Sequence, residues 1–148
     1  TADLAARRAT DYDRQTLTRI MEAMRAAHAQ GSFEAELQAD VDLHNAIGEA
    51  AHNIVLLHTL RACYRLLTQG IFFHRHLVFS SPAARADLLA QHEAIHAAIM
   101  AGDGNAARNA AQAHMDYIAV AIREAARSGE WQRISQLRLQ KRRLPPQA

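Results

Sequence analysis

Two polar residues that could bind a metal ion, Asp40 and His44, are spaced one helical turn apart in a predicted helix over residues 33–51. With an advance of about 100° per residue, both fall on the apolar face of that helix. This face is marked by Leu37, Leu43, Ile47 and Ala51. A charged carboxylate on a buried face is costly unless it is paired or bound to a metal. The Asp-x3-His pair would present an oxygen and an imidazole nitrogen side by side.

Two further histidines occupy the same kind of position on two later predicted helices. The stripe of His92 contains Leu88, Ile95 and Ile99, and the stripe of His114 contains Ala107, Ala111, Ile118 and Ala121. One such histidine alone is typical of a hydrogen-bonded core residue. Four buried polar groups would need four separate partners, so the set favours one shared ligand. We therefore predict a site for one divalent transition metal, formed by Asp40, His44, His92 and His114.

Nitrogen and oxygen ligands without sulfur fit zinc, nickel, iron or manganese, and the residue types do not choose among them. Zinc is the metal we expect first. One aspartate and three histidines would leave coordination positions open for a further ligand.

Two Glu-x-x-His sequences, Glu49–His52 and Glu93–His96, match the ligand motif of di-iron four-helix bundles. On its predicted helix, however, Glu49 lies roughly opposite Asp40. A di-iron site would therefore require the apolar face of that helix to point outward, and we favour the site with one metal. His96 is then a candidate for the wall of an adjoining pocket.

The next predicted helix carries a polar stripe that contains Ile54, His58, Arg61 and Arg65. Arg61 lies one turn from His58, and a guanidinium group binds a carboxylate through two parallel hydrogen bonds. The stripe indicates either a carboxylate-binding site or a solvated or inter-subunit edge.

The composition indicates that α-helices position these residues. The 148 residues suffice for one compact domain, and 32 of them are alanine while valine and isoleucine together number 13. Alanine favours helices, whereas β-branched residues favour strands. We predict an all-α antiparallel bundle of about six to seven helices. The predicted helices cover residues 1–9, 10–30, 33–51, 53–70, 82–101 and 103–127, with a short one near 131–137.

Charge and cysteine content exclude several classes of protein. The formal net charge of +2 is too small to mark a nucleic-acid-binding surface on this domain. The single cysteine excludes an internal disulfide. A single cysteine also suits a reducing compartment, so we expect a cytoplasmic location. No uncharged run reaches the roughly 18 residues of a membrane span, and we expect no contact with membranes.

The order and spacing of these residues resemble the FCD domain, the ligand-binding C-terminal half of bacterial GntR transcription regulators of the FadR subfamily. The resemblance extends over about residues 2–127, with 48 residues from His44 to His92 and 22 from His92 to His114. The segment from Gly48 to Arg61 resembles the branch that senses lactate, pyruvate or glycolate. The motifs are Asp40-x3-His44, Gln91-His92-Glu93-Ala94-Ile95, Ala101-Gly102-Asp103 and Ala113-His114.

The resemblance implies that residues 1–129 form a bundle holding one metal and a small carboxylate effector. It also implies a homodimer and a winged helix-turn-helix domain preceding Thr1, through which alone operator DNA would be bound. Residues 130–148 would form a short helix and a basic tail that contains proline. The implied metal ligands are again Asp40, His44, His92 and His114. The candidate effector contacts are Asn53, His58, Arg61 and His96, with Asn53 and Arg61 at the far oxygens.

Two other functions remain open from the sequence. A metal-dependent hydrolase would use metal-bound water and would need a general base beside the open coordination position. By helical periodicity, Asp42, Glu49 and Asp116 all point away from the ligand face, so we expect no catalytic residues and no enzyme. The other alternative is a helical dimerisation module with buried histidines and no ligand.

Overall fold

The computed structural model describes residues 1–63, 82–127, 135, 136 and 138, and within these ranges the ordered elements are all α-helices. The prediction of an all-α bundle is confirmed. The helices are α1 (Ala2–Arg8), α2 (Asp11–Ala29), α3 (Phe33–Ala50), α5 (Pro82–Met100) and α6 (Gly104–Arg127). A further helix covers residues 54–63. From residue 10 onward, every helix end that lies in the described ranges is within one residue of its predicted position, whereas the expected end at residue 70 lies outside them.

Side-chain caps explain where three of the helices begin. At the start of α2, Thr10 and Asp13 form a capping box, in which each side chain bonds the other's backbone N–H. The Asn53 side chain accepts hydrogen bonds from the backbone of residues 55 and 56, so it caps the helix of residues 54–63. Asp103 does the same for α6 by accepting from Ala106. These caps satisfy backbone groups that would otherwise lack partners.

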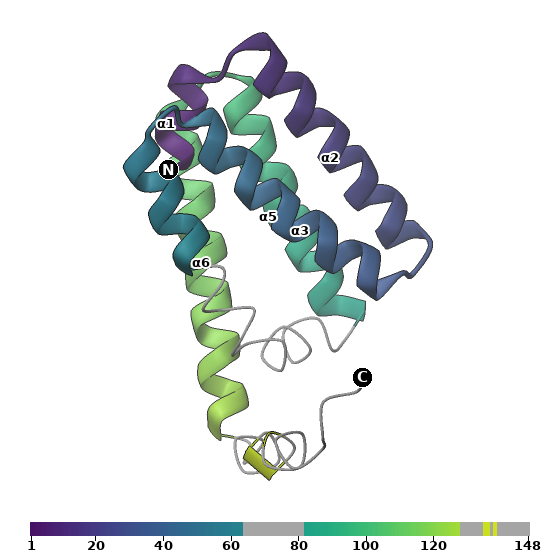
Figure 1. Cartoon of the computed structure of the whole chain (residues 1–148). Helices are drawn as coiled ribbons and strands as arrows, with labels where there is room; N and C mark the ends of the chain where they lie inside the picture. The colour runs from purple at the N-terminus through teal and green to yellow at the C-terminus, as the bar shows by residue number, and fades with distance from the viewer. Residues whose placement is uncertain (64–81, 128–134, 137, 139–148) are drawn as a thin grey trace, which may run out of the picture.

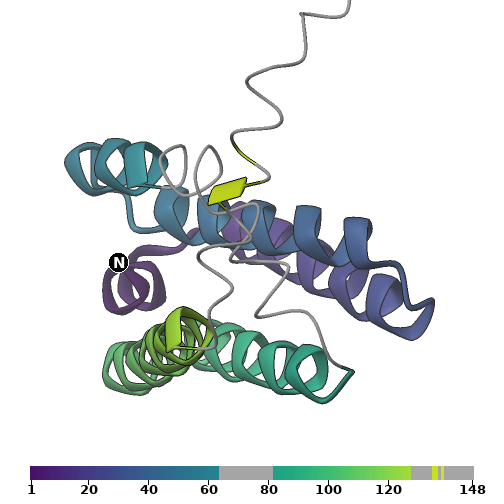
Figure 2. The same ribbon diagram turned by 90° about the horizontal axis from the view of Figure 1, so that it is seen from below.

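The helices form two antiparallel pairs, α2 with α3 and α5 with α6, that pack against each other (Figure 1). The view from below shows the α2–α3 pair above the α5–α6 pair, with α1 at one side (Figure 2). The short helix α1 contacts α3, α5 and α6. Residues from α3, α5 and α6 therefore meet in the interior of the bundle.

The buried apolar residues form two separate clusters along the bundle. The larger one includes Leu17, Met21, Leu43, Ile47, Ile95, Ile99 and Ala107. The smaller one consists of Leu37 and Leu88, with Phe33, Tyr117, Ile118 and Ala121 packed against them. On α5, His92 lies between Leu88 of the smaller cluster and Ile95 of the larger one, and on α3 the predicted ligands Asp40 and His44 alternate with residues of the larger cluster.

In the described part of the chain, no helix combines the length and the apolar character that a bilayer crossing requires.

Candidate metal centre

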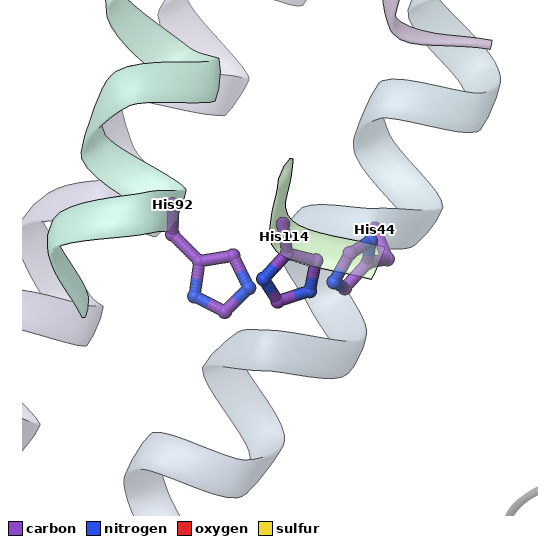
Figure 3. Close-up of side chains that lie close together, drawn as sticks. All are labelled: His44, His92 and His114. Atoms are coloured by element: carbon purple, nitrogen blue, oxygen red, sulfur yellow. The ribbon is translucent and has the colours of Figure 1, made fainter. Parts of the chain in front are cut away.

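Three histidines from three helices lie close together in the interior of the bundle: His44 on α3, His92 on α5 and His114 on α6 (Figure 3). The ring centroids are 5.3 Å apart for His44 and His92, 5.4 Å for His44 and His114, and 4.6 Å for His92 and His114. His92 and His114 are buried, with 1% and 4% of their surface exposed. The side chain of His44 is 15% exposed. Helical periodicity in the sequence had predicted an inward position for each of these three histidines.

Asp40 lies beside this group, one turn before His44 on α3. Its Oδ1 atom is 3.3 Å from Nε2 of His92 and 3.6 Å from Nε2 of His44. Asp40 is itself buried, with 6% of its surface exposed. A buried carboxylate is stabilised by charge-assisted contacts of this kind, and it would add a negative charge to any cation held by the imidazoles.

The donor set fits a divalent transition metal. One ligand nitrogen from each of the three histidines lies within 4.8 Å of the other two. Because Zn–N bonds are about 2.0–2.1 Å long, two nitrogens bound to one ion stand at most about 4.2 Å apart. Small rotations of the rings would bring the three nitrogens to that separation.

His114 is held in its neutral form, which is the form that binds metals. Burial lowers its pKa to about 4; the neighbouring His44 acts in the same direction, and Asp40 acts against it. Its Nδ1 atom lies 2.9 Å from Oε1 of Gln91, on α5. The ring of His114 is therefore fixed from the side of Nδ1 by the amide of Gln91.

A partly buried ion pair, whose buried member is Glu36, lies one turn before Asp40 on α3. Both carboxylate oxygens of Glu36 accept hydrogen bonds from the guanidinium of Arg85, and Oε1 also lies 3.2 Å from Nδ1 of His28. Only 4% of the Glu36 surface is exposed. A cavity of about 10 Å³, roughly the size that one water requires, adjoins Glu36, Arg85, His28, Asp40 and His92.

A larger cavity of about 400 Å³ opens on the other side of His44. Its walls are mostly apolar, and its polar residues other than His44 are Thr1, Asp3, Arg108 and Gln112. Arg108 donates a hydrogen bond to Asp3, which also accepts one from Arg7. The hydrogen bonds from Arg7 and Arg108 hold the pKa of the Asp3 carboxyl below its usual value. The same cavity is therefore lined by a candidate metal ligand, His44, and by the guanidinium group of Arg108.

None of the four residues expected from the sequence to contact an effector lines this cavity. Asn53 caps a helix, as described above. His58 is exposed, and Arg61 is exposed and donates a hydrogen bond to Glu49. His96 is half-buried with Nε2 3.4 Å from Oγ1 of Thr18 on α2. From the helix of residues 54–63, the cavity wall includes only Leu60.

The two Glu-x-x-His sequences also lie apart from the three histidines. Glu49 is exposed and bonded to Arg61, while His52 contacts Asp13 with 2.9 Å between Nε2 and Oδ2. Glu93 accepts a hydrogen bond from Arg25 on α2. Neither glutamate of the two motifs lies beside the three histidines in the described chain, so the motifs give the di-iron alternative no support.

Several residues of this region were not found from the sequence. Glu36 follows the same i, i+4 spacing as Asp40 and His44, so its place on the buried face was detectable by periodicity. Arg85 and Arg108 gave no comparable signal, and Gln91 was noted only as part of a motif that resembles the FCD domain, without a role. Their roles depend on which helix packs next to them, which one helix's periodicity does not specify.

Comparisons with known proteins identify the family that the chain resembles. The FCD domain family matches residues 1–117. A candidate L-lactate dehydrogenase operon regulatory protein of Escherichia coli K12 is 37% identical over 118 residues, covering 80% of this chain and 44% of that protein. The Glc operon transcriptional activator of the same strain is 31% identical over 117 residues, covering 77% and 46%. The HTH-type transcriptional regulator LutR of Bacillus subtilis 168 is 33% identical over 119 residues, covering 77% and 52%. The chain spans about half the length of these relatives.

Proposed function

The chain belongs to the FCD domain family, and we propose that it is the effector-sensing domain of a GntR-type transcriptional regulator. In this proposal it binds one divalent metal, with zinc first in line, and a small hydroxy- or keto-carboxylate. The main support for the proposal is that one ring nitrogen of each of His44, His92 and His114 lies within 4.8 Å of the other two. The buried carboxylate of Asp40 lies beside them. The metal, when bound, supplies a fixed positive charge to which an anion can bind.

The chain's own residues would bind and orient the effector in the cavity beside His44. Its apolar wall, which includes Ile47, Leu60 and Ile95, lowers the effective dielectric constant and so strengthens electrostatic contacts. Arg108 is the cationic side chain on this wall, and a guanidinium group binds carboxylates through two parallel hydrogen bonds. We therefore assign Arg108 to the effector's remaining oxygens. The names of the relatives, which include an L-lactate dehydrogenase operon regulator, support a small carboxylate.

The same cavity disfavours a metal-dependent hydrolase, which is the enzymatic alternative. The carboxylate on its described wall belongs to Asp3, and hydrogen bonds from Arg7 and Arg108 keep its pKa low. A carboxylate held in this way is a weak base. The relatives are named as regulators rather than as enzymes, which also supports a sensing role.

We propose the following organisation for the whole protein. Residues 1–129 would form the sensing bundle and residues 130–148 a C-terminal extension. Two copies would form a homodimer in the cytoplasm, and a separate winged helix-turn-helix domain would bind operator DNA. Effector binding could change DNA binding only to the extent that it favours one arrangement of the bundle over another.

Calorimetric titration of the zinc-loaded chain with glycolate, L-lactate and pyruvate tests this function. We expect at least one of these acids to bind, and we expect binding to disappear when a chelator removes the zinc. Lactamide, the neutral analogue of lactate, serves as the matched control and should not bind. Failure of all three acids to bind, or equal binding with and without zinc, would contradict the proposal.

A further inference from the structure

A hydrogen bond connects His114 on α6 to Gln91, the residue before His92 on α5. The two atoms are Nδ1 of His114 and Oε1 of Gln91, 2.9 Å apart in a partly buried setting. We propose that Gln91 is a positioning residue that holds His114 in the tautomer with its hydrogen on Nδ1, which leaves Nε2 free to bind the metal. This inference rests on the proposed metal site and adds to it a residue that does not itself bind the ion.

The chemistry of a neutral imidazole makes this hydrogen bond decisive. A neutral ring carries one N–H donor and one nitrogen with a lone pair, and either nitrogen can take either role. Only the neutral ring can bind a metal, and in that form His114 has one hydrogen to place. An amide oxygen can only accept, so Oε1 of Gln91 requires the hydrogen on Nδ1.

The opposite orientation of the Gln91 amide would have the opposite effect. Its NH₂ group would donate to Nδ1, and the ring hydrogen would move to Nε2. Nε2 could then no longer offer a lone pair to a metal. The side-chain amide of Gln91 thus decides which nitrogen of His114 is able to bind.

The hydrogen bond also fixes the angle of the ring. His114 lies between His92 and His44 in the close-up view, so rotation of its ring would move Nε2 relative to both (Figure 3). Partners of this kind orient metal-binding histidines and raise their basicity, and their loss typically weakens metal binding about 10- to 100-fold. Glutamine does this without adding charge to a site that already contains Asp40.

Three variants of the whole chain test the role of Gln91. Gln91→Leu removes the acceptor at similar volume, Gln91→Glu keeps an acceptor that cannot donate, and Gln38→Leu makes the same apolar change at an exposed position of α3. Zinc affinity is measured by competition with a chromophoric chelator at pH 7. The His114 tautomer is read in the metal-free protein from long-range ¹H–¹⁵N correlations.

We expect the hydrogen on Nδ1 in the wild type and in Gln91→Glu, and a mixture of tautomers in Gln91→Leu. Zinc affinity should fall about 10- to 100-fold in Gln91→Leu, stay near the wild-type value in Gln38→Leu, and be equal to or higher than the wild-type value in Gln91→Glu. A wild-type hydrogen on Nε2, an unchanged affinity in Gln91→Leu, or an equal loss in both Gln91 variants would overturn the inference. If the wild type binds no zinc, the proposed metal site fails, while the tautomer measurement still decides the role of Gln91.

Discussion

Asp40 and His92 bring a carboxylate oxygen and an imidazole nitrogen within 3.3 Å of each other, although they belong to different helices and are almost fully buried. A buried carboxylate oxygen and a buried imidazole nitrogen at this distance either form a hydrogen bond with each other or bind the same cation. The second arrangement is the one that the proposed metal site requires, because the same Asp40 oxygen also faces His44.

Replacement of Asp40 by asparagine should weaken zinc binding. The change keeps the size of the side chain and removes the negative charge beside the imidazoles, so we expect a loss of about tenfold or more in affinity. Competition with a chromophoric chelator at pH 7 measures the effect. Asp42→Asn, an exposed change two residues away on α3, is the matched control and should leave the affinity unchanged. Equal zinc affinity in the two variants would show that Asp40 does not contribute to metal binding.

The metal-free protein should lose stability as the pH falls from 7 towards 4, in part through His114. Burial lowers the folded-state pKa of His114 to about 4, from the ordinary histidine value of 6.5. Between these values the unfolded chain takes up a proton that the folded chain does not, so this contribution is present above pH 6.5 and is lost on acidification. The free energy of unfolding lost in this way between pH 7 and pH 4.5 is about 2 kcal/mol.

Urea unfolding in the presence of a chelator, at several pH values, measures this contribution. The wild type should lose about 2 kcal/mol more than His114→Gln between pH 7 and pH 4.5. His58→Gln, at an exposed position, should follow the wild type. Parallel pH profiles for the wild type and His114→Gln would show that His114 is not buried in its neutral form.

Loss of the Arg85 guanidinium should destabilise the fold strongly. Arg85→Met leaves the carboxylate of Glu36 buried without its two hydrogen bonds, and broken buried pairs of this kind typically cost about 3–5 kcal/mol. The double variant Glu36→Leu/Arg85→Met removes both charges and should recover most of the loss. Chemical denaturation measures both. A single variant as stable as the wild type would mean that this pair contributes little.

Arg108→Gln should weaken effector binding without changing zinc affinity. A hydrogen bond to a charged group contributes about 1.5–3 kcal/mol, so the expected loss in carboxylate affinity is roughly 10- to 100-fold. Arg61→Gln is the informative comparison. Both arginines are exposed and bonded to an acidic residue, but Arg108 lines the cavity and Arg61, which was expected from the sequence to contact the effector, does not. Calorimetry on the zinc-loaded chain decides between them. A loss in Arg61→Gln alone would favour the expectation from the sequence over the cavity.

The helices and the three histidines could be predicted because their signals are local. The caps at Thr10 and Asp103 and the stop at Gly102, which has a positive φ of 73°, act within a few residues of the chain. The buried faces follow from the helical period alone. Each histidine on an apolar stripe therefore had to point inward, and three inward stripes of one bundle meet in its interior.

The residues that line the cavity could not be predicted in this way because they depend on how one helix is placed against another. Gly48 allows the helix of residues 54–63 to approach α3 so closely that a Cβ atom at this position would lie 2.9 Å from Cδ2 of Leu60. This packing puts Leu60, rather than Arg61, on the cavity wall. The pairing of Gln91 with His114 likewise depends on the packing of α5 against α6, which neither helix specifies alone.

X-ray absorption at the zinc edge of the loaded chain tests the central claim most directly, since it counts the imidazoles around the ion and measures their distances. We predict one zinc per chain with three imidazole nitrogens at about 2.0–2.1 Å. Substitution of His92 by alanine should lower the imidazole count or abolish binding. A chain that binds no zinc, or a spectrum with fewer than three imidazoles that is unaltered by the His92 substitution, would contradict the proposed metal centre.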